Sequence, residues 1–148
     1  MKKLILILTF LFPVSSFAYW AEVASNDDGT TYYLDVETIK ERNGLVYYWS
    51  LIDYLKPTST GALSVKSLQE VNCNIPRKER ELSASYYSSP MGKNTPLVTY
   101  NKERPWRYSQ PNTILEFMID QVCEVNDVNK DICASPVRAK SDLCINRK

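Results

Sequence analysis

The chain is 148 residues long, with no histidine, four cysteines and ten tyrosines. The lack of histidine excludes Ser-His-Asp and Cys-His catalytic arrangements and removes the commonest general base at neutral pH. The formal net charge of +1 provides no global field that would attract nucleic acid or an anionic membrane.

The first 18 residues have the pattern of a secretory signal peptide. Two lysines precede an apolar run that ends at Pro13, and a Ser-x-Ala exit follows, which predicts cleavage after Ala18. A membrane anchor would need about 20 apolar residues, and this run is shorter. No cysteine sits at or just after the cleavage site, where a lipoprotein would need one to carry its lipid. We therefore expect an exported bacterial protein, periplasmic, on the cell surface or secreted, that begins at Tyr19 and has no stable membrane span.

Residues 20–54 predict an antiparallel meander. Strands over 20–24 and 30–35 flank an Asp-Gly turn, and an Asn-Gly turn precedes the strongest strand, at 45–54. Residues 36–42, between these strands, predict a short helical turn or loop. Both faces of the strand at 45–54 are largely apolar, so one should meet the core and the other should be covered by a helix or a partner.

The second half of the chain predicts two more strands, at 63–73 and 80–88, and then an irregular segment with a short strand at 97–100. Asn112 or Thr113 can cap a helix whose apolar stripe includes Phe117 and ends near Cys123. The predicted fold class is α+β: an antiparallel β-sheet meander of five to six strands with one C-terminal helix packed on it.

An even number of cysteines in an exported chain predicts two disulfides, for which three connectivities are possible. We favour Cys73–Cys123, which would tie the sheet to the helix, together with a local Cys133–Cys144 loop. The chain has no CxxC pair to build a zinc site, and no phosphate-binding or dinucleotide-binding glycine motif. We expect neither a metal nor another cofactor, and a binding or structural protein, not an enzyme.

Basic side chains and tyrosines are unevenly distributed. Residues 73–107 hold seven basic and three acidic side chains, which could dock an acidic partner or could guard a strand edge against aggregation. Three tandem tyrosine pairs should each place one ring on either side of the sheet. These rings could form an aromatic contact surface or could stabilise the sheet by cross-strand packing.

Several segments resemble the surface-adhesin protein E family. The resemblance is carried by Asp28–Asp35 (DGTTYYLD), Val46–Tyr54, Ser64–Cys73 and Ser83–Gly92 (SASYYSSPMG), and Trp20, Trp106, the helix and Cys123 complete the order. It covers residues 20–125 and implies a sheet-plus-helix fold, a Cys73–Cys123 bridge and a tendency to form homodimers. The chain then divides into a signal peptide (1–18), an adhesin E-like domain (19–125) and a C-terminal extension with a local disulfide (126–148).

The resemblance also implies a non-enzymatic protein that binds host extracellular-matrix or serum proteins such as vitronectin, laminin and plasminogen. In this family the host-binding stretch corresponds to residues 77–93. The candidate ligand-binding residues are Arg77, Lys78, Arg80, Tyr86, Tyr87, Met91 and Lys93. The alternative is a periplasmic envelope protein or a lysozyme-type inhibitor with no adhesive role, which would present the acidic residues of the N-terminal half.

Overall fold

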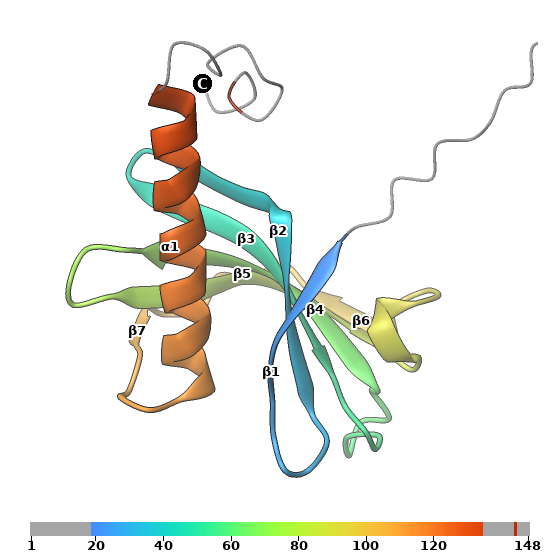
Figure 1. The fold of residues 1–148 in the computed structure, drawn as a ribbon. Coiled ribbons are helices and arrows are strands. Elements are labelled where there is room, and N and C mark those ends of the chain that lie inside the picture. The colour runs from blue at the N-terminus through green and yellow to red at the C-terminus, as the bar shows by residue number, and fades with distance from the viewer. Residues whose placement is uncertain (1–18, 135–143, 145–148) are drawn as a thin grey trace, which may run out of the picture.

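The computed structural model describes residues 19–134 and Cys144, so the predicted signal peptide lies outside the described residues. The fold is a seven-stranded antiparallel sheet with one long helix, α1, packed on one face (Figure 1). The strands are β1 (Trp20–Ser25), β2 (Thr31–Arg42), β3 (Leu45–Asp53), β4 (Ser64–Asn72), β5 (Lys78–Tyr87), β6 (Val98–Tyr100) and β7 (Arg107–Tyr108). They lie side by side in chain order from β1 to β6, and β7 pairs with the start of β5. The predicted fold class is confirmed.

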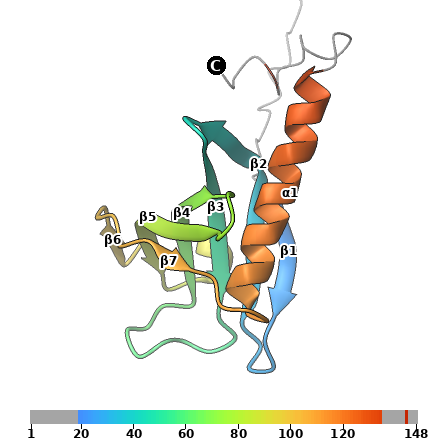
Figure 2. The ribbon, with the colours of Figure 1, turned by 90° about the vertical axis from the view of Figure 1, so that its left-hand side faces the viewer.

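β2 is longer than the sequence predicts, and the helical turn or loop expected over 36–42 is wrong. The register between β2 and β3 is interrupted between Asp35 and Lys40, where the strand changes direction (Figure 2). Side chains replace the missing ladder bonds. The Thr38 hydroxyl donates to the Asp35 carbonyl at 2.8 Å and accepts from the Trp49 N–H at 3.1 Å. The segment is therefore a β-bulge held by a threonine, and the strand continues through it.

α1 runs from Ile114 to Ala134, so its predicted end near Cys123 is wrong. Its start is as predicted, because the Thr113 hydroxyl accepts from the Glu116 N–H at 3.2 Å in an N-cap. The second half is held by polar contacts to the β2–β3 hairpin. The buried Asn126 amide donates to Glu41 at 2.9 Å, and Lys130 forms a salt bridge with the same carboxylate.

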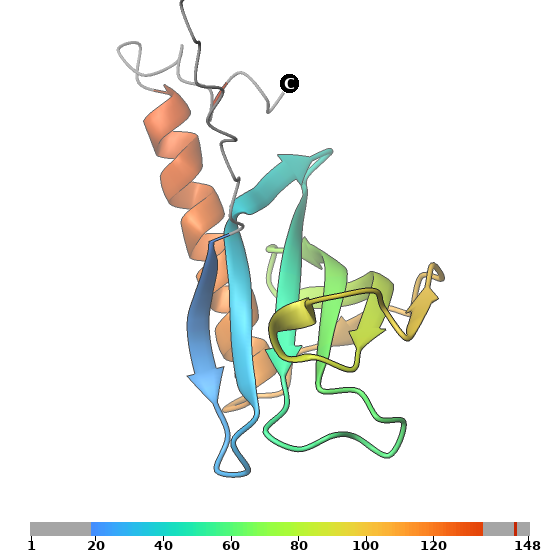
Figure 3. The same ribbon diagram turned by 90° about the vertical axis from the view of Figure 1, so that its right-hand side faces the viewer.

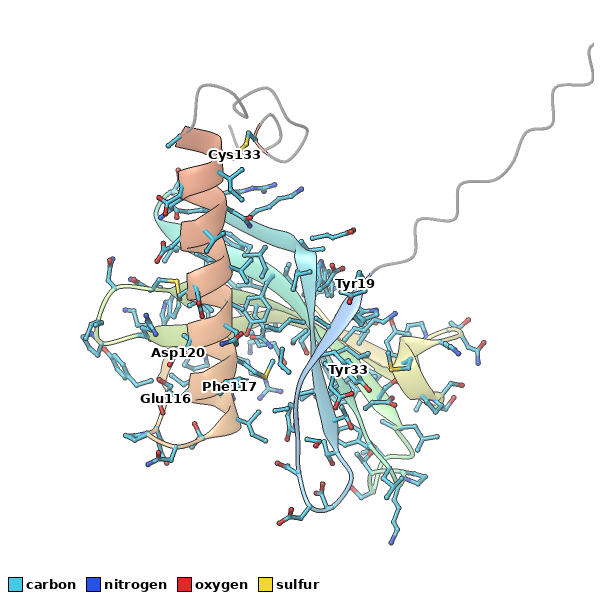
Figure 4. The ribbon with its side chains drawn as sticks, in the orientation of Figure 1. Tyr19, Tyr33, Glu116, Phe117, Asp120 and Cys133 are labelled. Carbon is cyan, nitrogen blue, oxygen red and sulfur yellow. A yellow bond between two sulfur atoms is a disulfide. The ribbon has the colours of Figure 1, made fainter. Side chains whose placement is uncertain are left out.

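The core lies between α1 and one face of the sheet. It comprises Leu34, Ile39, Val46, Tyr48 and Val71 from the strands and Met118, Ile119, Val122 and Cys123 from the helix. Phe117, predicted on the apolar stripe, is instead 47% exposed, near the start of α1 (Figure 4). The predicted disulfides Cys73–Cys123 and Cys133–Cys144 are both present. Of the residues described, none belongs to a helix with the length and apolar character needed to cross a membrane.

The segment 88–110 is only partly irregular. It contains a 3-10 turn, η1 (Pro90–Gly92), the predicted short strand as β6, and β7, which the sequence did not predict. η1 contacts β3 and β4 on the side of the sheet away from α1 (Figure 3). It therefore covers one end of the face that the helix leaves open.

Candidate binding surface

The seven candidate residues form two groups at the two ends of β5. Arg77, Lys78 and Arg80 lie at its start, whereas Tyr86 and Tyr87 end the strand and lead to Met91 and Lys93. At about 3.3 Å per residue, Arg80 and Tyr87 are separated by roughly 23 Å along the strand. The structure therefore does not bring the seven residues together into one contact site.

The arginines of the basic segment are held by acidic neighbours. Arg80 forms salt bridges with Glu70 and Glu103, and the other pairs are Arg77–Asp120, Arg104–Glu81 and Arg107–Glu79. Burial alone would raise the pKa of Glu70, but hydrogen bonds from Arg80 and Tyr47 outweigh burial and lower the pKa. Glu70 and Asp120 lie outside residues 73–107, so their pairs with Arg80 and Arg77 offset two of the four surplus positive charges of that segment.

Trp106 is the aromatic centre of the group at the start of β5. The Lys78 ammonium lies 5.1 Å from the centre of a Trp106 ring and the Arg80 guanidinium 4.8 Å from it, distances typical of cation–π contacts. Arg80 is three-quarters buried by these neighbours. The group is therefore a packed cation–aromatic layer, in which Lys78 is the cation without a carboxylate partner among the salt bridges of the described chain.

The opposite end of β5 is fixed by hydrogen bonds to η1. The Met91 N–H donates to Asp53 at 2.7 Å, and the Gly92 N–H donates to the Ser64 hydroxyl at 2.8 Å. The Lys66 ammonium donates to the Gly92 carbonyl at 3.0 Å. Asp53, the last residue of β3, thus has a structural role in positioning η1.

Lys66 also contacts aromatic rings from two other strands, β1 and β5. Its ammonium lies 5.5 Å from the ring centre of Tyr87 and 5.7 Å from that of Trp20. Burial lowers the pKa of Lys66. Tyr87 is therefore engaged in a contact within the protein, on the face that α1 does not cover.

Tyr86 lies on the other face and belongs to an exposed patch, of which the sequence marked only Tyr86 and Lys93 as candidate binding residues. Its ring packs edge-to-face on Tyr100, with 6.0 Å between ring centres. Leu97, Val98 and Tyr100 are each between 40% and 55% exposed, and Lys93 and Lys102, which flank them in the sequence, are exposed as well. We call Tyr86, Lys93, Leu97, Val98, Tyr100 and Lys102 the β6 edge patch. The signal for it was three large apolar residues, Leu97, Val98 and Tyr100, in and just before a strand of three residues.

Comparisons with known proteins agree with this fold. Residues 20–124 match the family model of surface-adhesin protein E. Crystal form II of Haemophilus influenzae protein E is similar, with a TM-score of 0.53 and 18% identity over 76% of this chain and 92% of that one. Two further protein E structures, one from H. influenzae and one from a non-typeable strain, give TM-scores of 0.52 and 0.51 at 18% identity. Each covers 76% of this chain, and the matches extend over 89% and 80% of those chains respectively.

A comparison with curated proteins finds no match. At 18% identity, the similarity to the protein E structures shows only that the fold is shared. The family model matches most of the chain and therefore shows family membership. The protein belongs to the surface-adhesin protein E family.

Proposed function

We propose that this protein is an exported, non-enzymatic bacterial adhesin that binds a host extracellular-matrix or serum protein. The observation that carries the proposal is the family match over residues 20–124, since membership of this family supports a role as a surface adhesin. Vitronectin, laminin and plasminogen are the ligands to test first. The family also points to a location on the cell surface, reached by the predicted signal peptide.

The β6 edge patch is the contact surface that the structure favours. Exposed aromatic side chains such as Tyr100 are enriched at protein interfaces, and the lysines would lie at the polar rim. β6 is also the last strand of the sheet, so its outer edge can receive a strand from a partner. The group at the start of β5 is less suited, because its arginines are already bound to carboxylates.

The test is binding of the exported chain to immobilised vitronectin, laminin and plasminogen, measured by biolayer interferometry. Lys93→Glu combined with Lys102→Glu should weaken binding at least about tenfold, because two charges reverse at the interface. Lys56→Glu, in the exposed loop after β3, is the matched control and should bind like the wild type. Lack of binding to all three proteins would contradict the proposal, and inhibition of lysozyme in a parallel assay would identify the alternative function.

A second copy of the chain is a further proposed partner, as the family resemblance implies. β1 and β6 end the sheet on its two sides, and either edge could pair with another molecule. Light scattering during size-exclusion chromatography would show a dimer mass. A monomer mass at micromolar concentration would contradict this part of the proposal.

A further inference from the structure

A pocket of about 320 Å³ opens on the face of the sheet away from α1. Tyr47 and Trp49 line it from β3, and Leu68, the cross-strand partner of Trp49, lines it from β4. Tyr48, between the two aromatic residues, points into the helix-side core, so its neighbours point to the opposite face. Tyr47, Trp49 and Leu68 are each only partly buried. The floor of the pocket is therefore aromatic and open to solvent.

The walls of the pocket are polar and come from the bulged strand. Glu37 and Thr38 lie within the β2 bulge, and Lys40 and Arg42 follow it at alternate positions that share the pocket face. The Thr38 hydroxyl is fixed by its bonds to the Asp35 carbonyl and the Trp49 N–H. Bulges often redirect side chains towards a binding site. Here the bulge brings a carboxylate, a hydroxyl and two cations beside two aromatic rings.

Arg42 differs from every other arginine that the structure describes. The other four, Arg77, Arg80, Arg104 and Arg107, each form a salt bridge with a carboxylate. No salt bridge of the described chain includes Arg42 or Lys40. Glu70, which lies across from Tyr47, is already bound by Arg80 and by the Tyr47 hydroxyl. The pocket thus presents two cations that form no salt bridge within the described chain.

These features select one ligand chemistry. We propose that the pocket binds a carboxylated sugar at the end of an acidic glycan. The Trp49 and Tyr47 rings would pack against the apolar face of the sugar ring, and Arg42 and Lys40 would bind its carboxylate. Glu37 and Thr38 would bond its hydroxyl groups. The volume is within the roughly 300–1,000 Å³ range of small-molecule sites.

The carboxylate of Glu37 narrows the choice of ligand. A sulfated polysaccharide or a phosphate group has more negative charge than a single carboxylate, and part of it would lie close to Glu37. Like charges repel at short range, so such ligands would be disfavoured. A sugar with a single carboxylate can keep its charge at Arg42 and Lys40 and turn hydroxyl groups to Glu37. The pocket should therefore prefer a monocarboxylated sugar to inorganic phosphate and to a neutral hexose. This site is separate from the β6 edge patch, so host-protein binding and sugar binding can be measured independently.

Tryptophan fluorescence of the exported chain tests the proposal, with N-acetylneuraminic acid and glucuronate as probes and glucose and inorganic phosphate as controls. The chain has three tryptophans, Trp20, Trp49 and Trp106. A saturable change with the acidic sugars should persist in Trp20→Phe and Trp106→Phe and disappear in Trp49→Phe. The conservative replacement keeps a ring in the strand, so the fold is retained, and saturation-transfer NMR should still detect the bound sugar.

Charge variants complete the test. Arg42→Gln should weaken binding of the acidic sugars at least about tenfold, because it removes a charge-assisted hydrogen bond. Lys56→Gln removes another exposed cation, in the loop after β3, and should have no effect. The proposal is overturned if neither acidic sugar binds at millimolar concentration, if glucose or phosphate binds equally well, or if Arg42→Gln binds like the wild type.

Discussion

Glu79 is a carboxylate in the protein interior, with only 1% of its surface exposed. The buried Tyr48 hydroxyl donates to it at 3.1 Å, and the partly exposed Arg107 binds it from the solvent side. Burial raises the pKa of Glu79, and the bonds from Arg107 and Tyr48 offset this only in part. This residue therefore fastens the start of β5 to both the core and β7, and it does so as a group that is easier to protonate than an ordinary glutamate.

Replacing Glu79 by glutamine should change the pH dependence of stability. A carboxyl with a raised pKa binds protons more tightly when folded, so its stabilising contribution is present in acid and is lost as pH rises through the folded pKa. Glutamine does not titrate, so the variant does not lose stability in this way as pH rises. The difference in thermal unfolding midpoint, variant minus wild type, should therefore be higher at about pH 7 than at about pH 4. Circular dichroism at both pH values measures the difference.

Glu103→Gln is the control for this experiment, since Glu103 also pairs with an arginine but is 63% exposed. A relative midpoint for Glu79→Gln that stays constant or falls between about pH 4 and about pH 7 would contradict the assigned role of Glu79.

At the scale of elements, the sequence predicted correctly those features that depend on local interactions. The Asp-Gly and Asn-Gly turns, the alternating strands and the Thr113 cap depend on neighbouring residues, and all were found near their predicted places. The β2 bulge and the second half of α1 depend on distant partners. Thr38 needs the Trp49 N–H, and Asn126 needs Glu41, which is 85 residues away in the sequence. The hydrophobic periodicity of one segment cannot identify partners that lie far away in the sequence.

The short element η1 gives the sharpest prediction at this scale. Gly92 and Gly61 both have positive φ angles, +59° and +79°, so alanine at either position is strained by about 1–2 kcal/mol. A methyl group at Gly61 meets open space, whereas at Gly92 it would collide with the Lys66 side chain. Gly92→Ala should therefore destabilise the protein by about 1–2 kcal/mol more than Gly61→Ala, because Lys66 also loses its bond to the Gly92 carbonyl.

Chemical denaturation of the two glycine variants measures this difference. The same pair of substitutions in a Lys66→Ala background should bring the two losses close together. Equal losses in the wild-type background would show that Lys66 does not hold η1 in place.

At the scale of the whole molecule, the sequence located the binding segment more readily than the binding surface. Residues 77–93 were marked by composition and resemblance, yet the sheet spreads them over both ends of β5 and over both faces. Pairs with carboxylates from outside the segment, Arg80–Glu70 and Arg77–Asp120, neutralise charge that a count along the segment leaves free. The pocket at Trp49 was hidden for the same reason, because its two cations follow a bulge that only the folded sheet reveals.

The two disulfides should contribute unequally to stability. Cys73–Cys123 closes a loop of 50 residues and joins β4 to α1 at the core, whereas Cys133–Cys144 closes one of 11 residues at the end of the helix. On the chain-entropy relation these loops correspond to about 4 and about 3 kcal/mol. Cys123 is also buried, so Cys73→Ala with Cys123→Ala loses packing as well as the cross-link.

Urea denaturation followed by circular dichroism should thus show a loss of about 4 kcal/mol or more for the Cys73/Cys123 double variant and at most about 3 kcal/mol for the Cys133/Cys144 double variant. This order follows from the fold, in which one bridge couples the sheet to the helix and the other restrains only the helix end. The reverse order would mean that the segment after α1 contributes to the folded core, and it would place the end of the cooperative domain beyond Ala134.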